Sequence, residues 1–226
     1  MTNMKSVYLE KTQRGLAQVW IDFESALVTV PIIDRLTSGR LRLEDYRRLL
    51  VNMRQQVIEG SRWISRAASN LSPAHEDLRT KFVKHAAEEH RDYLMLERDY
   101  LATGGNVAVM HRTPKNIGSE ALSAFMYQAA SQPDPVGLLG AMFIIEGLGE
   151  RLAAGWADAI RAQLDLGTDC VRFLAYHGAN DEDHMAMFDA ALAGAVTTED
   201  IGADIVRHAK IVARLYRLQL EELDNV

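Results

Sequence analysis

The amino-acid sequence predicts an all-α protein, a bundle of about seven helices that forms one domain over residues 1–226. Apolar residues recur at helical spacing along most of the chain, and no segment shows the alternating pattern of a β-strand. Only 5 Pro and 15 Gly interrupt that spacing, which leaves uninterrupted stretches of roughly 20 to 30 residues, as long as the helices of a bundle. With 48% hydrophobic and 25% charged residues, the composition suits one globular core.

Each expected helix is bounded by residues that commonly start or stop one. Pro31 is expected to kink the first helix, Pro73 stands near the first turn of the third, and Gly104-Gly105 ends the third. The segment Asn106–Ser119 is expected to be irregular. The seven helices are expected at about residues 6–36, 43–70, 73–102, 119–131, 135–164, 173–191 and 197–223.

Charge and cysteine content narrow the partners and the compartment. The net charge of −6 argues against nucleic acid as a partner. The single cysteine, Cys170, allows no internal disulfide, which fits a reducing cytosol. No apolar run reaches the roughly 18 residues of a membrane span, and the first residues lack the continuous apolar segment of a secretory signal. We therefore expect a cytoplasmic protein with no membrane partner.

The stretch Phe173–Ala191 places three polar side chains on the helix face that should be buried. At about 100° per residue, all three fall within about 80° of Phe173. They are His177, Asp181 and His184. A buried charge is costly unless it is paired or bound to a metal, and imidazole with carboxylate suits iron, manganese or zinc. The stripe therefore predicts a metal shell, although histidines that are only hydrogen-bonded within the core would also explain it.

Three other expected helices offer carboxylates that could complete such a site. Glu146 lies at the centre of the apolar stripe of the fifth helix, where a lone carboxylate needs a cation or a proton; an arginine partner is the alternative. In the third helix His85, Glu89 and Asp92 form one strip beside the apolar centre, a pattern that also suits a solvated face. Glu59 in the second helix is kept as a fourth wall of the site, although a surface position would explain it equally well.

At these positions the chain resembles the haem-oxygenase-like superfamily, and within it the di-iron oxidases and oxygenases known as iron-containing redox enzymes. The motif His177-x3-Asp181-x2-His184 is similar to the family's last ligand motif, and Glu146 stands where the family places its bridging carboxylate. The segment HAAEEHRDYLMLERDYLATGG is similar to the family helix that reads H-x-x-E-E-x-x-H-D. The resemblance spans about residues 43–191 and implies a haem-oxygenase-like helical fold.

The resemblance also implies a site for two iron ions, with one departure from the family pattern. Asp92 stands where the family's earlier motif has a histidine, while Glu89 is retained; a carboxylate can still bind iron. One metal or none is the alternative. The implied ligands are Glu59, Glu89, Asp92, Glu146, His177, Asp181 and His184, with His85 in reserve.

The resemblance implies an O2-dependent oxidase or oxygenase that acts on a small organic substrate, with a homodimer as one expected assembly. An external electron donor is expected because the sequence shows no dinucleotide or flavin motif. The alternatives are a metal-free helical binding protein and a cofactorless oxidase of the same superfamily. Haem ligation is not expected because no histidine precedes His75, and the helix around Glu146 lacks the cysteine nucleophile of thiaminase-like relatives.

Overall fold

The computed structural model describes residues 2–225, with side chains for residues 4–179 and 187–225. Helices and short helical turns make up its regular structure, and no strand occurs in residues 2–225, which confirms the all-α prediction. The helices are α1 (Thr2–Leu27), α2 (Pro31–Thr37), α3 (Leu43–Asn70), α4 (Glu76–Glu89), α5 (Tyr93–Ala102), α6 (Val107–Arg112), α7 (Ile117–Ala130), α8 (Leu138–Leu148), α9 (Ala154–Leu164), α10 (Arg172–Ala195) and α11 (Glu199–Glu221).

The seven expected helices are present, but three of them are divided. The first consists of α1 and α2, which meet at a 75° bend before Pro31. The third consists of α4 and α5, and the fifth consists of α8 and α9 joined by a π-helical turn, Gly149–Ala153. The short helix α6 lies in the segment that was expected to be irregular. None of the described helices is by itself long and apolar enough to cross a membrane. Among the described helices, the bent pair α1 and α2 reaches that length and apolar content when the two are counted together.

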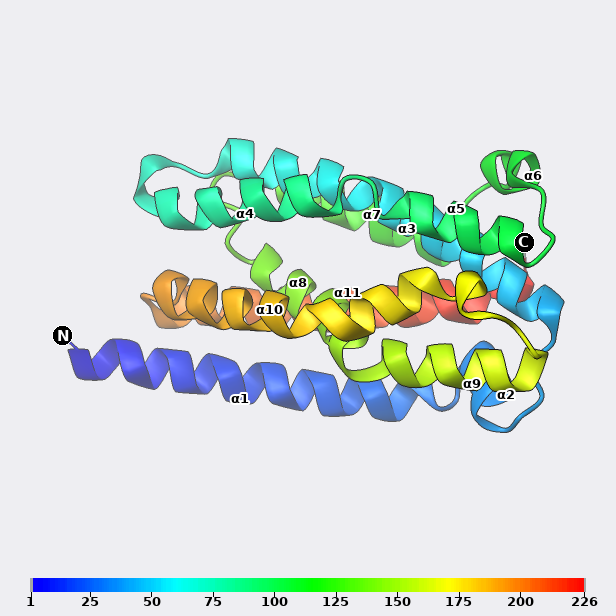
Figure 1. Cartoon of the computed structure of the whole chain (residues 1–226). Coiled ribbons are helices and arrows are strands. Elements are labelled where there is room, and N and C mark those ends of the chain that lie inside the picture. Colours follow the sequence, from blue (N-terminus) through cyan, green and yellow to red (C-terminus); the bar gives the residue numbers. More distant parts are fainter. Residues whose placement is uncertain (1, 226) are drawn as a thin grey trace.

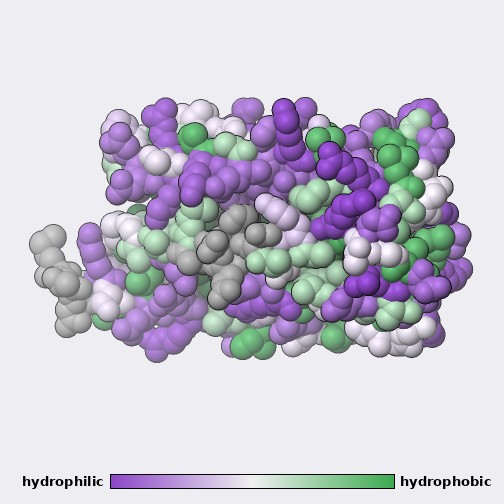
Figure 2. Space-filling view, viewed as in Figure 1, coloured by the Kyte–Doolittle hydropathy of each residue, from purple (hydrophilic) through white to green (hydrophobic). Residues whose placement is uncertain are grey.

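The helices lie roughly along one direction in three layers (Figure 1). One outer layer contains α3, α4, α5 and α7, the middle layer contains α8, α10 and α11, and the other outer layer contains α1, α2 and α9. The helix α11 packs against α1, α7 and α8, so it joins all three layers. Hydrophilic residues dominate the face shown in Figure 2, with apolar residues scattered among them.

The apolar face of α11 shows why the helices assemble in this way. Ile205, Ala209, Val212, Tyr216 and Leu220 recur at intervals of three and four residues, and all are buried. Burying a large apolar side chain stabilises the fold by about 1.5–3 kcal/mol, so packing of this face outweighs intrinsic helix propensity. The resulting core is continuous through α1, α3, α8, α10 and α11.

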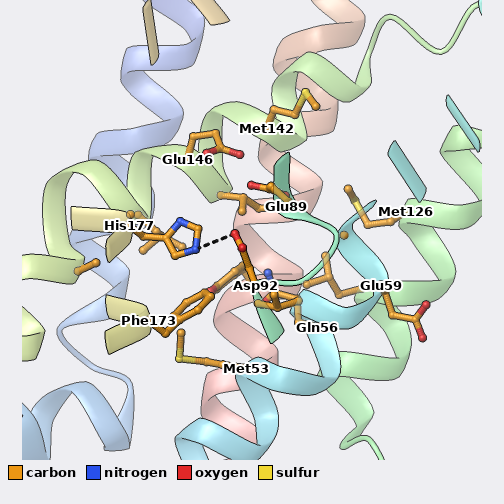
Figure 3. Close-up of a pocket in the computed structure, with 18 of the residues that line it drawn as sticks. Met53, Gln56, Glu59, Glu89, Asp92, Met126, Met142, Glu146, Phe173 and His177 are labelled. Carbon is orange, nitrogen blue, oxygen red and sulfur yellow. Dashed lines mark ion pairs between the residues drawn. The ribbon is translucent and has the colours of Figure 1, made fainter. Parts of the chain in front are cut away.

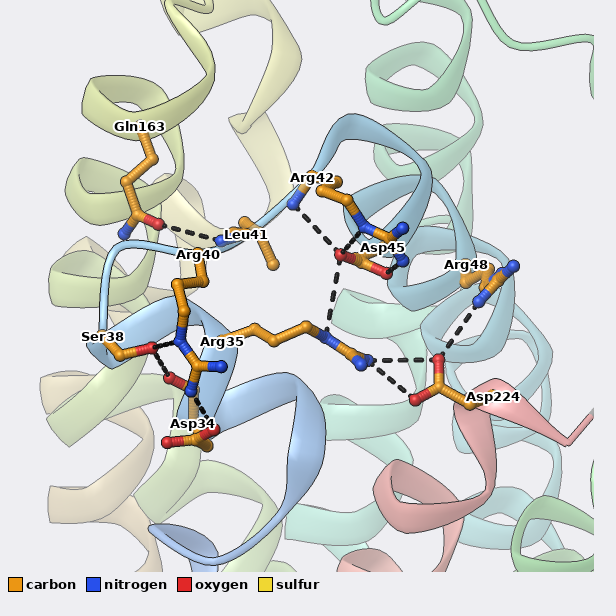
Figure 4. Close-up of polar contacts among 10 residues, drawn as sticks. All are labelled: Asp34, Arg35, Ser38, Arg40, Leu41, Arg42, Asp45, Arg48, Gln163 and Asp224. Carbon is orange, nitrogen blue, oxygen red and sulfur yellow. Dashed lines mark hydrogen bonds and ion pairs between the residues drawn. The ribbon is translucent and has the colours of Figure 1, made fainter.

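An ionic cluster joins the start of α3 to the end of the chain (Figure 4). The carboxylate of Asp45, which is fully buried, accepts hydrogen bonds from Arg42 and lies 3.7 Å from Arg35 Nε. Arg35 also donates two hydrogen bonds to Asp224, which lies 3.1 Å from Arg48 Nη1. The side-chain hydrogen bonds from Arg42 lower the pKa of Asp45, so this carboxyl is ionised near neutral pH.

Candidate metal centre

Three side chains with metal-binding atoms converge between α4 and α8. His85 and Glu89 stand one turn apart on α4, and Glu146 lies near the end of α8. His85 Nε2 is 3.1 Å from Glu146 Oε1 and 3.5 Å from Glu89 Oε1. One ligand atom from each of the three residues lies within 4.8 Å of the others. We call these three residues the acidic triad; the side chains of His85 and Glu146 are only 5% and 6% exposed.

A second pair of side chains lies beside the acidic triad (Figure 3). His177 Nε2 on α10 is 3.4 Å from Asp92 Oδ2, and both residues border the same cavity as Glu89 and Glu146. The ring of Phe173, one turn earlier on α10, packs against the imidazole of His177 with the ring centroids 4.3 Å apart. The two rings are inclined at 48°, and this contact supports the imidazole on the side where it approaches Asp92.

The start of α10 is fixed by two buried contacts from other helices. The backbone N–H of Phe173 donates to Asp99 Oδ2 on α5 at 2.9 Å, and the hydroxyl of Tyr46 on α3 donates to the carbonyl of Cys170 at 2.6 Å. Burial raises the pKa of Asp99 to about 6, above its ordinary value of 3.8. Together these contacts position the first turns of α10, including His177.

A break between α4 and α5 explains how Asp92 reaches the site. The expected continuous helix over residues 73–102 is wrong here, because residues 90–92 form a turn. The N–H groups of Asp92 and Leu94 bond carbonyls three residues earlier, and His90 Nδ1 lies 2.8 Å from the carbonyl of Ala87. No Gly or Pro marks this turn in the sequence. It leaves Glu89 as the last residue of α4 and Asp92 just before α5.

A π-helical turn begins three residues after Glu146. The expected uninterrupted fifth helix is divided by Gly149–Ala153, where the backbone widens to a π turn. Such turns are rare and occur often at functional sites. Gly178, next to His177 on α10, packs against Ala154 at the start of α9 so closely that an added Cβ would lie 2.8 Å from Ala154 Cβ. The turn and this glycine bring α10 close to the helix that carries Glu146.

The electrostatics of the acidic triad favour a bound cation or a shared proton. Glu89 borders the cavity, and burial together with the charge of Glu146 raises the pKa of Glu89 above its usual value. His85 and His177 act in the opposite direction, because a positively charged imidazole lowers that pKa. Two carboxylates and an imidazole that converge in a buried place form a donor set that suits iron, as in carboxylate-rich sites of helical bundles. The donor chemistry therefore fits the metal that the sequence implies.

The predicted ligands fall into three groups in the structure. Glu89, Asp92, Glu146 and His177 border one cavity. Glu59 borders it too, but its carboxylate is held by Lys115 Nζ at 3.1 Å and by the Tyr127 hydroxyl at 2.5 Å, and Figure 3 shows it turned away from Glu89. The side chains of Asp181 and His184 lie outside the described residues.

His85 was kept in reserve in the sequence, one turn before Glu89 on the same strip of the helix. In the structure its Nε2 lies closer to Glu146 than to Glu89, so His85 stands between the two carboxylates.

The fold and the site together define a helical bundle with a buried carboxylate–imidazole centre. The model of the iron-containing redox enzyme family matches residues 47–217, and the chain belongs to that family. The matched segment includes Glu59, Glu89, Asp92, Glu146 and His177. No curated protein matches the chain in sequence.

Solved structures share the fold at low sequence identity. A domain of unknown function with a haem-oxygenase-like fold from Shewanella denitrificans OS217 is 19% identical, has a TM-score of 0.85, and matches 92% of this chain and 90% of its own. A TenA homologue from Pseudomonas syringae pv. tomato is 14% identical with a TM-score of 0.73, over 93% of this chain and 92% of its own. A putative TenA-like thiaminase from Sulfolobus solfataricus is 16% identical with a TM-score of 0.66, over 96% of this chain and 95% of its own. The fold of this chain is therefore haem-oxygenase-like.

Proposed function

We propose that the protein is a non-haem di-iron enzyme that uses O2 to oxidise a small organic substrate. The observation that carries this proposal is the acidic triad together with the Asp92–His177 pair. Four of these five residues line one cavity: Glu89, Asp92, Glu146 and His177. Ferrous iron held by these residues would offer O2 open coordination positions and would pass to it the electrons that an external donor provides. Family membership supports iron as the metal.

The two groups of donors suggest how the metals would be divided. The acidic triad would hold one iron through His85 Nε2 and two carboxylates. Asp92 and His177 would contribute to the second, with Asp181 and His184 as the sequence-predicted ligands farther along α10. Glu89 belongs to the triad and precedes Asp92 by three residues, so its carboxylate would be within reach of either group of donors. Glu59 would have to leave Lys115 and Tyr127 to become a ligand, so we assign it to the cavity wall.

The protein's own part of the reaction is to position the substrate and to limit the access of water. The cavity wall next to the centre is mostly apolar, so a bound substrate would displace water from the reacting groups. Electrons would come from an external donor. The cytosolic location and the homodimeric state are predictions of the same proposal.

Iron titration of purified protein tests the centre. Anaerobic protein is loaded with ferrous iron, desalted and analysed for bound metal, and the wild type should hold up to two irons per chain. His177→Ala should abolish tight binding at the second position because it removes an imidazole donor. Asp92→His should raise occupancy toward two, since it restores the family's histidine. His111→Ala is the matched control, because His111 is exposed and its ring contacts Glu97.

The titration also separates the alternatives. Equal iron binding by the wild type, His177→Ala and Asp92→His would place the metal elsewhere. Absence of iron, manganese and zinc after both aerobic purification and ferrous loading would favour the metal-free binding protein. Consumption of O2 with substrate by such a metal-free protein would instead identify a cofactorless oxidase.

A further inference from the structure

Two separate cavities reach the acidic triad. The cavity of Figure 3, here called the main cavity, borders Glu89 and Glu146. A smaller cavity between α4, α8 and α10, here called the side crevice, borders Glu146 and the third member of the triad, His85. Each helix contributes residues that lie about one turn apart and so share one face. Beside His85 and Glu146, the described residues that line the side crevice are Lys81, Phe82, Leu139, Met142, Met187, Phe188 and Ala191.

The surface that these described residues turn to the side crevice is entirely apolar. The polar atoms of the triad are directed elsewhere, because His85 Nε2 lies 3.1 Å from Glu146 Oε1 and 3.5 Å from Glu89 Oε1. A metal bound by these atoms would hold them within the triad in the same way. The side crevice therefore presents carbon-rich walls to a ligand whether or not the triad holds a metal.

The size of the side crevice limits what it can hold. Its volume is about 30 Å³, room for a molecule of two or three atoms. A buried water needs about two to four polar partners, whereas apolar cavities stay dry and take up apolar guests such as xenon. The described walls supply no such partners. The side crevice thus suits a small apolar gas better than it suits water or an organic molecule.

The side crevice adjoins the surface through a wider groove. This groove lies between the start of α4 and the end of α10, and it shares Lys81 and Ala191 with the side crevice. At the triad the side crevice adjoins the main cavity, since Met142 and Glu146 line both. These two residues are one turn apart on α8 (Figure 3). Methionine is unbranched and adapts its shape, so Met142 forms a movable partition between the two spaces.

We propose that the side crevice is the entry route and holding site for O2, separate from the main cavity that would receive the organic substrate. This inference rests on the proposed function, which requires both reactants at one centre. A substrate in the main cavity would cover the approach bordered by Glu89, Asp92 and His177. The side crevice leaves O2 a second approach, past His85 and Glu146.

Methionine methyl NMR of the metal-free protein under O2 pressure tests the holding site. Dissolved O2 is paramagnetic, so it speeds the relaxation of the methyl protons that it approaches. Met187 lines the side crevice, Met110 is buried with 1% exposed surface, and Met4 is 57% exposed and reports O2 in bulk solvent. The enhancement at Met187 should exceed that at Met4 and should be at least about threefold that at Met110, since O2 concentrates in an apolar space. An enhancement at Met187 no larger than that at Met110 would overturn the proposal.

A substitution that fills the side crevice tests the route. Ala191→Leu places a larger side chain where the side crevice meets the surface groove. It should reduce the enhancement at Met187 to the level of Met110, and in iron(II)-loaded protein it should slow the reaction with O2 several-fold at unchanged iron content. Ala191→Val should give a smaller loss of both. Ala162→Leu makes the same change as Ala191→Leu on the exposed side of α9 and should alter neither quantity. Reaction of the Ala191→Leu protein with O2 at the wild-type rate would refute the route.

A substitution in the main cavity tests whether the two routes are separate. Leu122, on α7, lines the main cavity, and Leu122→Phe narrows that space. The enhancement at Met187 should be the same as in the wild type, because O2 enters the side crevice from the surface groove. A loss as large as that in Ala191→Leu would show that O2 passes through the main cavity, and it would overturn a separate entry.

The O2 route and the di-iron function can fail separately. The NMR measurement uses metal-free protein, so a strong enhancement at Met187 in a chain that binds no iron would leave the gas site standing and refute the di-iron function. Iron loading and O2 consumption without enhancement at Met187 would do the reverse.

Discussion

Gly178 is the position where a single methyl group should disturb the candidate metal centre without touching a ligand. A Cβ at this residue would lie 2.8 Å from both Cβ and N of Ala154, closer than real Cβ atoms come to other heavy atoms. In Gly178→Ala the helix α10 must therefore move away from the start of α9. Because His177 is the neighbouring residue, this movement should also weaken its approach to Asp92, now 3.4 Å.

The expected magnitude follows from a matched control on the same helix. Gly194 has nothing within 4 Å of an added Cβ, so Gly194→Ala tests the helix propensity of alanine alone, a gain of up to about 1 kcal/mol. Gly178→Ala has the same propensity gain but adds an overpacking cost of about 1–3 kcal/mol. The two variants should therefore differ by about 1–3 kcal/mol, and each kcal/mol corresponds to roughly 2–4 °C in Tm for a chain of this size.

Thermal unfolding and iron titration measure the two consequences. Gly178→Ala should melt below Gly194→Ala and should bind the second iron more weakly, while Gly194→Ala should bind iron like the wild type. Equal Tm values together with equal iron binding would refute the claim that the close contact between α9 and α10 positions His177.

Two further predictions concern buried carboxylates outside the metal centre. The folded-state pKa of Asp99 is raised to about 6, so the stability that its protonated carboxyl contributes is fully present below about pH 3.8 and is lost as pH rises through 6. The side chain introduced by Asp99→Asn does not titrate, so this variant should gain up to roughly 2–3 kcal/mol in unfolding free energy relative to the wild type between about pH 4 and pH 7. A difference in unfolding free energy that does not vary with pH would contradict this. The pKa of Asp45 is lowered instead, so its stabilisation is present above its usual value and lost as pH falls through the folded-state pKa. At pH 7 Asp45→Asn should cost about 2–3 kcal/mol in urea unfolding because it weakens the bonds from Arg42. The exposed pair Asp34–Arg40 is the control, and Asp34→Asn should change stability by less than about 0.5 kcal/mol; similar losses in both variants would show that burial of Asp45 does not matter.

Local sequence pattern predicted the placement of two residues of the site. His177 and Glu146 were assigned to apolar stripes, and both side chains are buried. The helical period makes such an assignment reliable, because it depends only on which face of one helix carries the apolar residues. The same argument predicted the all-helical class, which needs no knowledge of how the helices pack.

The partners of those residues were decided by tertiary structure. The turn at residues 90–92 has no Gly or Pro to announce it, and it brings Asp92 to His177 because α4 and α5 pack separately against α3 and α10. The carboxylate of Glu59 was expected to face the metal, but Lys115 and Tyr127, both more than fifty residues away in sequence, hold it at the cavity wall. His85 meets Glu146 because α8 places Glu146 Oε1 3.1 Å from His85 Nε2. The sequence by itself therefore determined the helices and their buried faces, through interactions within one or two turns. Only the folded chain determined which polar side chains meet, because those contacts depend on how whole helices are placed by packing of the core.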